Sequence, residues 1–77
     1  MNKKNLNVIK KIVSDATDQN IKNIKYETKS SDIFKWDSLA QIKIISSLEK
    51  IFKKKINTTK AGSLKSIMEI SKFIDSK

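Results

Sequence analysis

The chain of 77 residues contains no proline and a single glycine. Proline and glycine are the residues that most often end helices and form the tight turns of β-hairpins. Their scarcity, together with isoleucine and leucine residues spaced three or four positions apart, predicts an all-α fold. We expect a small bundle of three or four helices with one long loop between the first and second helices. Because a chain of this length can bury only one small core, residues 1–77 are expected to form a single domain.

Three segments have the apolar spacing of amphipathic helices. The first covers residues 4–17, and its predicted buried residues are Ile9, Ile12, Val13 and Ala16. The second covers residues 38–53, and its predicted stripe consists of Leu39, Ile42, Ile45, Leu48 and Phe52, widened by Ile44 and Ile51. The third begins near Ser66, and the core residues expected from it are Ile67, Met68, Ile70, Phe73 and Ile74.

The segments between these helices have weaker patterns. Residues 18–36 are mostly polar, and the apolar side chains expected to attach this long loop to the core are Ile21, Ile24, Tyr26, Ile33 and Phe34. A loop of this length in a compact domain is usually functional. After the second helix, Asn57 interrupts the apolar pattern and Gly62 marks a short connector.

Capping signals mark the predicted helix ends. Asp37 or Ser38 can cap the second helix, and residues 38–41 match the capping-box pattern, in which Ser or Thr is followed three positions later by Glu or Gln. Residues 66–69 match the same pattern. The lysines at positions 53–55 follow the end of the second helix, where cations complement the helix dipole.

The composition limits the chemistry available to the chain. It has 17 lysines, 8 acidic residues and no arginine, histidine or cysteine, so its formal charge is +9. Without cysteine and histidine there is no disulfide, no thiolate or imidazole metal site, and no histidine to act as a general base. The composition therefore excludes hydrolytic triads, zinc sites and redox centres, and we expect no metal site.

The charge of +9 first suggests a nucleic acid or an anionic membrane as the partner. However, lysine, isoleucine and asparagine, whose codons are rich in A and T, make up 36 of the 77 residues, so genomic bias is a second explanation. Arginine, the preferred residue for recognising bases and phosphates, is absent. The alternative function is a small basic helical domain that binds nucleic acid or another protein. Its phosphate-contacting residues would be Lys50, Lys53, Lys54, Lys55 and Lys60.

The N-terminal segment begins with lysines, as a signal peptide does, but no apolar stretch follows them. No segment of the chain approaches the length of a transmembrane helix. We therefore expect a cytoplasmic protein that does not insert into a membrane.

One serine stands at the junction of the long loop and the second helix, within Trp36-Asp37-Ser38-Leu39. By itself this serine is explained as a helix cap, because serine is a preferred N-cap residue. From residue 37 to residue 74, however, the sequence resembles the acyl carrier protein family, whose Asp-Ser-Leu signature is present at positions 37–39. The pattern of the family's following segments is matched by Ile42, Ile44, Ile45, Leu48, Glu49, Phe52, Ile56, Leu64, Ser66, Ile67, Ile70, Phe73 and Ile74.

The resemblance implies a carrier protein without catalytic activity of its own. Ser38 would be the attachment site of a covalent 4′-phosphopantetheine arm, transferred from coenzyme A by a phosphopantetheinyl transferase. Acyl or aminoacyl groups would be held on the thiol of this arm as thioesters, so that the cofactor supplies the sulfur that the chain lacks. The other implied partners are enzymes that load and transfer acyl or aminoacyl groups in fatty-acid-like or specialised biosynthesis. We expect a monomer and no nucleic-acid partner.

The same resemblance assigns roles around Ser38. Asp37 and Leu39 would flank the cofactor, with Asp37 either positioning the serine for the transferase or acting only as a cap. The predicted partner-docking residues are Trp36, Ala40, Ile42 and Lys43. Trp36 is expected either to anchor a partner or to cover the open end of the bundle.

The charge departs from the family pattern. Familiar acyl carrier proteins are strongly acidic, whereas Ala40 and Lys43 occupy positions that are usually acidic. The Trp-Asp-Ser-Leu form is more similar to specialised stand-alone carriers, including the D-alanyl carrier type. Over residues 37–52 two lysines balance two acids. We therefore expect partners that do not rely on a strongly basic docking patch.

Overall fold

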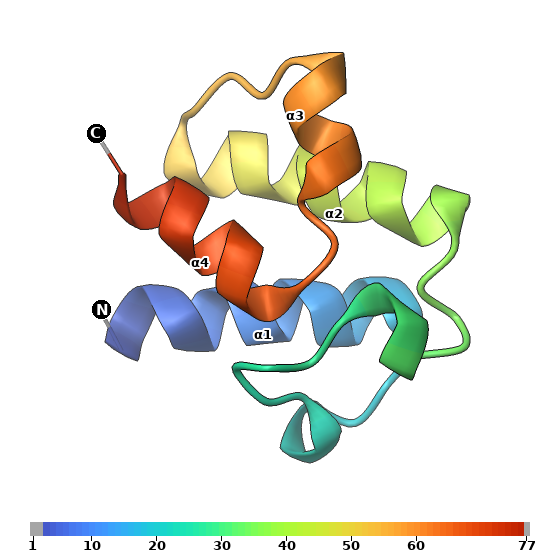
Figure 1. Cartoon of the computed structure of the whole chain (residues 1–77). Coiled ribbons are helices and arrows are strands. Elements are labelled where there is room, and N and C mark those ends of the chain that lie inside the picture. The colour runs from blue at the N-terminus through green and yellow to red at the C-terminus, as the bar shows by residue number, and fades with distance from the viewer. Residues whose placement is uncertain (1–2, 77) are drawn as a thin grey trace.

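Helix α1 (Lys3–Thr17) is the first element of the computed structural model, which describes residues 3–76 (Figure 1). The apolar side chains on its inner face are Ile9, Ile12 and Val13, which are buried, and Ala16, which is partly buried. This face confirms the predicted first helix. The helix is followed by Asp18, whose left-handed backbone (φ 58°) turns the chain into the long loop.

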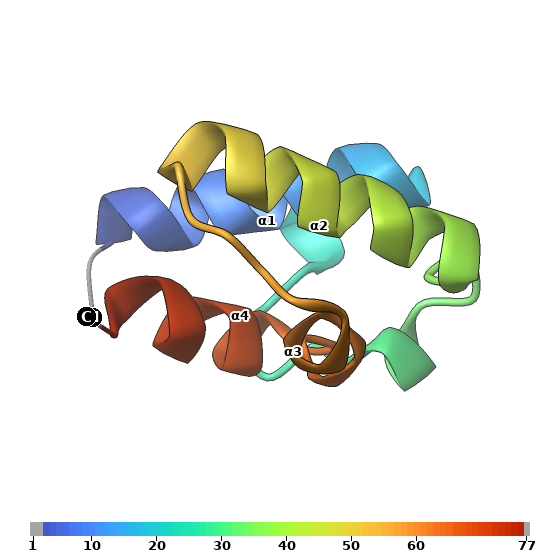
Figure 2. The same ribbon diagram turned by 90° about the horizontal axis from the view of Figure 1, so that it is seen from above.

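Three further helices follow in residues 3–76: α2 (Ser38–Phe52), α3 (Thr58–Ser63) and α4 (Ile67–Asp75). Helix α1 packs against both α2 and α4. Figure 2 shows α1 and α2 antiparallel in one layer, with α4 and the short α3 in a second layer. The described part of the chain contains no β-strand and no helix long and apolar enough to cross a membrane. The predicted all-α bundle, with its long loop between the first two helices, is confirmed.

The inner face of α2 differs from the predicted stripe. Its buried residues are Ala40, Ile44 and Leu48, with Ile45 and Phe52 partly buried. Three residues of the predicted stripe are exposed instead, namely Leu39, Ile42 and Ile51. The prediction was wrong for these three because α2 is apolar around much of its circumference, so that spacing alone does not decide which side meets α1.

The loop between α1 and α2 contains two short 3₁₀ turns, Ile21–Asn23 and Ser30–Asp32. Its buried side chains are Ile24, Ile33 and Trp36, with Tyr26 partly buried. Ile21 and Phe34 were predicted to attach the loop to the core, but both are exposed. The prediction that Ile21 and Phe34 attach the loop to the core was therefore wrong.

The loop also pairs with the segment that precedes α4. The Ser30 N–H donates to the Lys65 carbonyl (2.8 Å), and the Ile67 N–H donates to the Thr28 carbonyl (3.0 Å). Together these bonds form an isolated antiparallel bridge. The loop is therefore held by buried side chains on one side and by backbone hydrogen bonds to the α3–α4 connector on another.

Side-chain caps start the three later helices. The acceptor–donor pairs are Asp37 with the Ala40 N–H, Asn57 with the Lys60 N–H, and Ser66 with the Glu69 N–H. The Ser66 hydroxyl also donates to the Glu69 carboxylate (3.1 Å), so that the carboxylate binds this hydroxyl in place of the Ser66 backbone N–H, and one bond of the predicted capping box forms. Two expectations are corrected here. The connector after residue 56 contains helix α3, which is too short for a periodic signal, and Met68 is exposed because it lies on the outer side of α4.

Candidate functional site

Ser38 is the first residue of α2, and its side chain is exposed. Asp37, with extended backbone (φ −101°, ψ −170°), caps the helix: its Oδ1 accepts a hydrogen bond from the Ala40 N–H at 2.9 Å. Because Asp37 provides the cap, the Ser38 hydroxyl is not needed for it. This hydroxyl makes no hydrogen bond to any residue in the range 3–76. Of the two predicted caps, the structure therefore selects Asp37.

The side chain of Gln41 joins this helix start to the rest of the bundle. Its Oε1 accepts a hydrogen bond from Trp36 Nε1 at 2.6 Å, and its Nε2 donates to the Ala61 and Leu64 carbonyls, both at 2.9 Å. These bonds connect the loop, the first turn of α2 and the end of α3. The capping box predicted for residues 38–41 is therefore wrong, because the Gln41 amide is engaged by Trp36 and two distant carbonyls.

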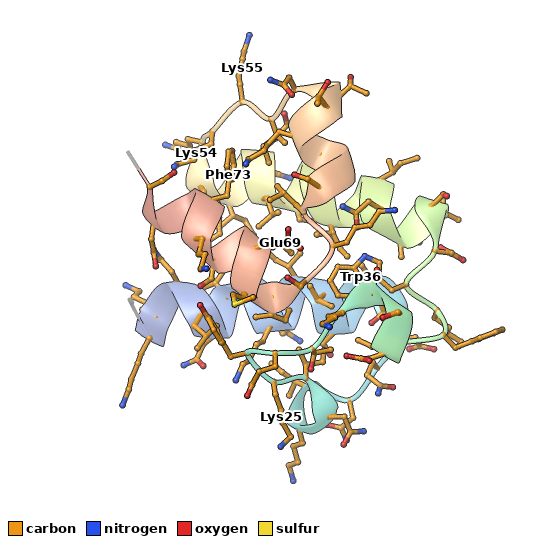
Figure 3. The ribbon with its side chains drawn as sticks, in the orientation of Figure 1. Lys25, Trp36, Lys54, Lys55, Glu69 and Phe73 are labelled. Carbon is orange, nitrogen blue, oxygen red and sulfur yellow. The ribbon has the colours of Figure 1, made fainter. Side chains whose placement is uncertain are left out.

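The structure divides the four predicted docking residues into two pairs. Trp36 is 6% exposed and Ala40 is 3% exposed, so neither presents a side chain to a partner. Ala40 is buried because it lies on the inner face of α2. Trp36 packs into the core where the loop meets the helices (Figure 3), which corresponds to the covering role. Ile42 (66% exposed) and Lys43 do lie on the surface.

Two more apolar side chains near Ser38 are exposed. Leu39 is 63% exposed, and Phe34, four residues before the serine, is 99% exposed. Phe34 lies within a turn in which the Trp36 N–H donates to the Ile33 carbonyl (3.0 Å). In this turn the two end residues, Ile33 and Trp36, are buried, and Phe34 between them is exposed. The three-residue spacing of the buried ends is the signal in the sequence that could have identified Phe34 as a surface residue.

Three hollows border the exposed part of α2. One of about 750 Å³ lies between α1 and α2, and its apolar lining consists of Val8, Ile12, Ala16, Ile42 and Ile51. A second of about 350 Å³ lies between α2 and α3, and its apolar lining includes Ile42, Ile45 and Ile56. The third, of about 340 Å³, has Ser38 and Trp36 in its wall.

The lysine-rich segment, residues 53–55, lies beyond the C-terminal end of α2, at the other end of this helix from Ser38. Lys54 Nζ donates to the carbonyls of Phe73 (3.1 Å) and Ser76 (2.7 Å), and it lies 5.2 Å from the centre of the Phe73 ring. Carbonyls at a helix C-terminus lack partners within the helix, so Lys54 supplies donors to the end of α4. Its hydrogen bonds thus stabilise the C-terminal end of α4, whereas the sequence predicted that Lys54 complements the dipole of α2. Lys55, in contrast, is exposed and points away from the protein (Figure 3).

Within residues 3–76, no group of three or more acidic side chains could hold a metal ion. In the comparisons with known proteins, no family model and no curated protein matches the chain. The resemblance to acyl carrier proteins therefore stays a prediction that rests on the sequence of residues 37–74.

Proposed function

We propose that this protein is a carrier that holds acyl or aminoacyl groups as thioesters on a 4′-phosphopantetheine arm attached to Ser38. The observation that carries the proposal is the Ser38 hydroxyl, which is exposed and makes no hydrogen bond within residues 3–76. It stands on the first residue of a helix that Asp37 already caps. A free hydroxyl on a rigid, capped helix start is accessible to a modifying enzyme and held in one place. The Asp-Ser-Leu signature at positions 37–39 adds the family resemblance.

The surroundings of Ser38 fit a phosphodiester. In the first turn of α2, backbone N–H groups without helical partners and the positive end of the helix dipole favour an anion. A recess of about 340 Å³ adjoins the serine and contains Lys65 in its wall. Ser38 would hold the group covalently, with the first turn of α2 and Lys65 beside the phosphate.

The attachment reaction balances with coenzyme A as the donor. A bond forms between Ser38 Oγ and the phosphorus next to pantetheine, while the pyrophosphate bond of coenzyme A breaks. The adenosine bisphosphate half leaves, and the hydroxyl proton passes to the transferase. The arm supplies a thiol for thioester formation, which the chain cannot provide because it has no cysteine.

The surface next to Ser38 offers partner enzymes apolar side chains and an uncompensated lysine. Leu39 and Ile42 are exposed on α2, and Phe34 projects from the preceding turn. Lys43 makes no ion pair with other residues of the described range. An apolar partner surface with neutral or acidic residues at its rim complements these groups better than a basic patch does.

The alternative function is a basic nucleic-acid-binding domain. Its predicted set of phosphate-contacting lysines is smaller in the structure than the sequence suggested. Lys54 is bonded to the end of α4, and Lys60 lies over the Phe73 ring at 5.5 Å. Fewer lysines are therefore free to contact phosphates. A steep salt dependence of binding to DNA or RNA would support this alternative.

The proposal is tested by intact-mass measurement after incubating the protein with coenzyme A, Mg²⁺ and a broad-specificity phosphopantetheinyl transferase. We expect a mass gain of one phosphopantetheine group, and no gain in Ser38→Ala. Ser46→Ala is the matched control, because it removes another exposed hydroxyl from the same helix and should be modified like the wild type. The absence of a mass gain, or a gain that survives Ser38→Ala, would overturn the proposal.

A further inference from the structure

The recess beside Ser38 lies where three segments of the chain meet. The loop contributes Ser30 and Trp36, the start of α2 contributes Ser38, and the α3–α4 region contributes Gly62 and Lys65. Its volume of about 340 Å³ is close to the lower end of the range for small-ligand pockets, about 300–1,000 Å³. We infer that this recess binds the phosphate and the first part of the arm, with the Lys65 ammonium as the phosphate contact. The inference rests on the proposed attachment at Ser38.

The walls of the recess are fixed by hydrogen bonds to one another. The Trp36 indole N–H is bonded to Gln41, which in turn is bonded to two carbonyls at the end of α3. Across the recess, the Lys65 carbonyl accepts a hydrogen bond from the Ser30 N–H (2.8 Å). A site whose walls are already joined loses little conformational freedom on binding. The recess is therefore suited to holding part of a flexible arm.

The charges in the wall favour Lys65 as the phosphate contact. The Asp37 carboxylate lies in the same wall, so a phosphate on the adjacent serine has a negative neighbour. The Lys65 side chain is exposed and makes neither an ion pair nor a hydrogen bond with residues 3–76. An uncommitted ammonium group can form a charge-assisted hydrogen bond to phosphate. It would offset the repulsion from Asp37.

Gly62 offers a position in the wall of the recess where a larger side chain can be introduced without distorting the fold. A Cβ atom placed on this residue would meet no other atom within 4 Å. The space beside the glycine is therefore open to a side chain, and a leucine there would narrow the recess or the neighbouring hollow between α2 and α3, because Gly62 lines both.

The chain provides its own reporters for an experiment. It contains one tryptophan and one glycine, and both lie in the wall of the recess. Nitrogen-15 NMR therefore gives two signals identifiable by residue type, the Trp36 indole N–H and the Gly62 amide. After modification has been verified by mass, we expect both signals to shift between the unmodified and modified protein. Gly62 is the more informative reporter, because it is far from Ser38 in the sequence and senses the arm only through space.

Variants separate the roles of charge and volume. Lys65→Gln keeps a long polar side chain and should reduce the Gly62 shift by about half or more, because the phosphate loses a charged partner. Lys55→Gln, which removes an exposed lysine beyond the other end of α2, is the matched control and should leave the shift unchanged. Gly62→Leu, which adds a side chain in the wall of the recess, should retain the mass gain but reduce the shift of the Trp36 signal.

Each outcome decides one claim. Complete modification without a shift at Gly62 would overturn the recess as a binding site, while leaving Ser38 as the attachment site. Equal shifts in Lys65→Gln and the wild type would overturn the role of Lys65. The absence of a mass gain would overturn the proposed function and, with it, the inference about the recess.

Discussion

At the N-terminal end of α2, Asp37 and Gln41 supply the hydrogen bonds that stabilise the helix start, and the Ser38 hydroxyl between them is left without a partner in residues 3–76. Beyond the C-terminal end, Lys54 itself supplies the hydrogen bonds that complete α4. Both ends carry polar residues that suggest a function in the sequence. At the N-terminal end, a neighbour of Ser38 makes the hydrogen bond to the helix backbone. Beyond the C-terminal end, Lys54 makes such bonds itself.

This difference shows why the charge of +9 is a poor guide to function. The predicted phosphate-contacting lysines are the most conspicuous polar feature of the sequence, yet Lys54 is a structural donor and Lys60 lies over an aromatic ring. Ser38 is one of ten serines and carries no charge. Its availability depends on Asp37, which provides the cap that a serine would otherwise provide.

Replacing Gln41 with alanine should disturb the N-terminal end of α2 most strongly. The change leaves the buried Trp36 N–H and two carbonyls without their partner, and we expect a loss of about 2–3 kcal/mol in the free energy of unfolding. Urea unfolding followed by circular dichroism measures this loss. Gln19→Ala is a control elsewhere in the chain and should change stability by less than about 0.5 kcal/mol. Equal stability of the two variants would show that the Gln41 network does not hold this end together.

Phe34→Ser tests whether the exposed apolar surface near Ser38 contacts the transferase. Because Phe34 is 99% exposed, its replacement should leave the unfolding free energy unchanged. Loss of an aromatic contact should lower kcat/KM for phosphopantetheinyl transfer about tenfold. Met68→Ser, which removes another exposed apolar side chain, should keep the wild-type value. Unchanged transfer to the Phe34 variant would remove this residue from the docking surface.

Lys54→Ala tests the opposite end of the comparison. The variant loses two hydrogen bonds to the end of α4, and we expect it to be less stable by about 1 kcal/mol. Lys55→Ala removes an exposed lysine next to it and should change stability by less than about 0.5 kcal/mol. Modification of Ser38 should proceed normally in both variants. Similar stability of the two variants would mean that the hydrogen bonds of Lys54 do not stabilise the end of α4.

Lys43→Glu should have the smallest effect. It introduces an acidic residue on the exposed side of α2 and should speed loading by a fatty-acid enzyme that docks through basic residues. The gain should be at most about fivefold, because an exposed charge pair contributes no more than about 1 kcal/mol. Ser46→Ala on the same surface serves as the neutral control. Equal or slower loading of Lys43→Glu would contradict the charge argument.

The sequence predicted elements with one clear apolar face better than elements without one. Helices α1 and α4 have their buried isoleucines where the spacing placed them. Helix α2 was predicted in extent but not in orientation, because Leu39 and Ile42 are as apolar as the buried Ile44. Helix α3 has six residues and too few turns to show a period.

Only part of the candidate site could be predicted, because some of its features depend on neighbouring residues and others on contacts between distant segments. The position of Ser38 at the start of α2 follows from local sequence, whereas the choice of Asp37 over Ser38 as the cap is decided only by the hydrogen bond from the Ala40 N–H. The burial of Trp36 and the exposure of Phe34 depend on the turn between them and on a Gln41 amide that reaches α3. The turn is local and shows in the sequence as the three-residue spacing of Ile33 and Trp36, whereas the tertiary hydrogen bonds of Gln41 leave no such signal.

Peptide mapping of the protein after treatment with coenzyme A and the transferase tests the central claim most directly. Ten serines are present, and several besides Ser38 are exposed, so the location of the modification is not fixed by chemistry alone. We predict that tandem mass spectrometry finds one phosphopantetheine group, attached to Ser38. A group on any other serine, or no modified peptide, would contradict the assignment of Ser38 as the carrier site.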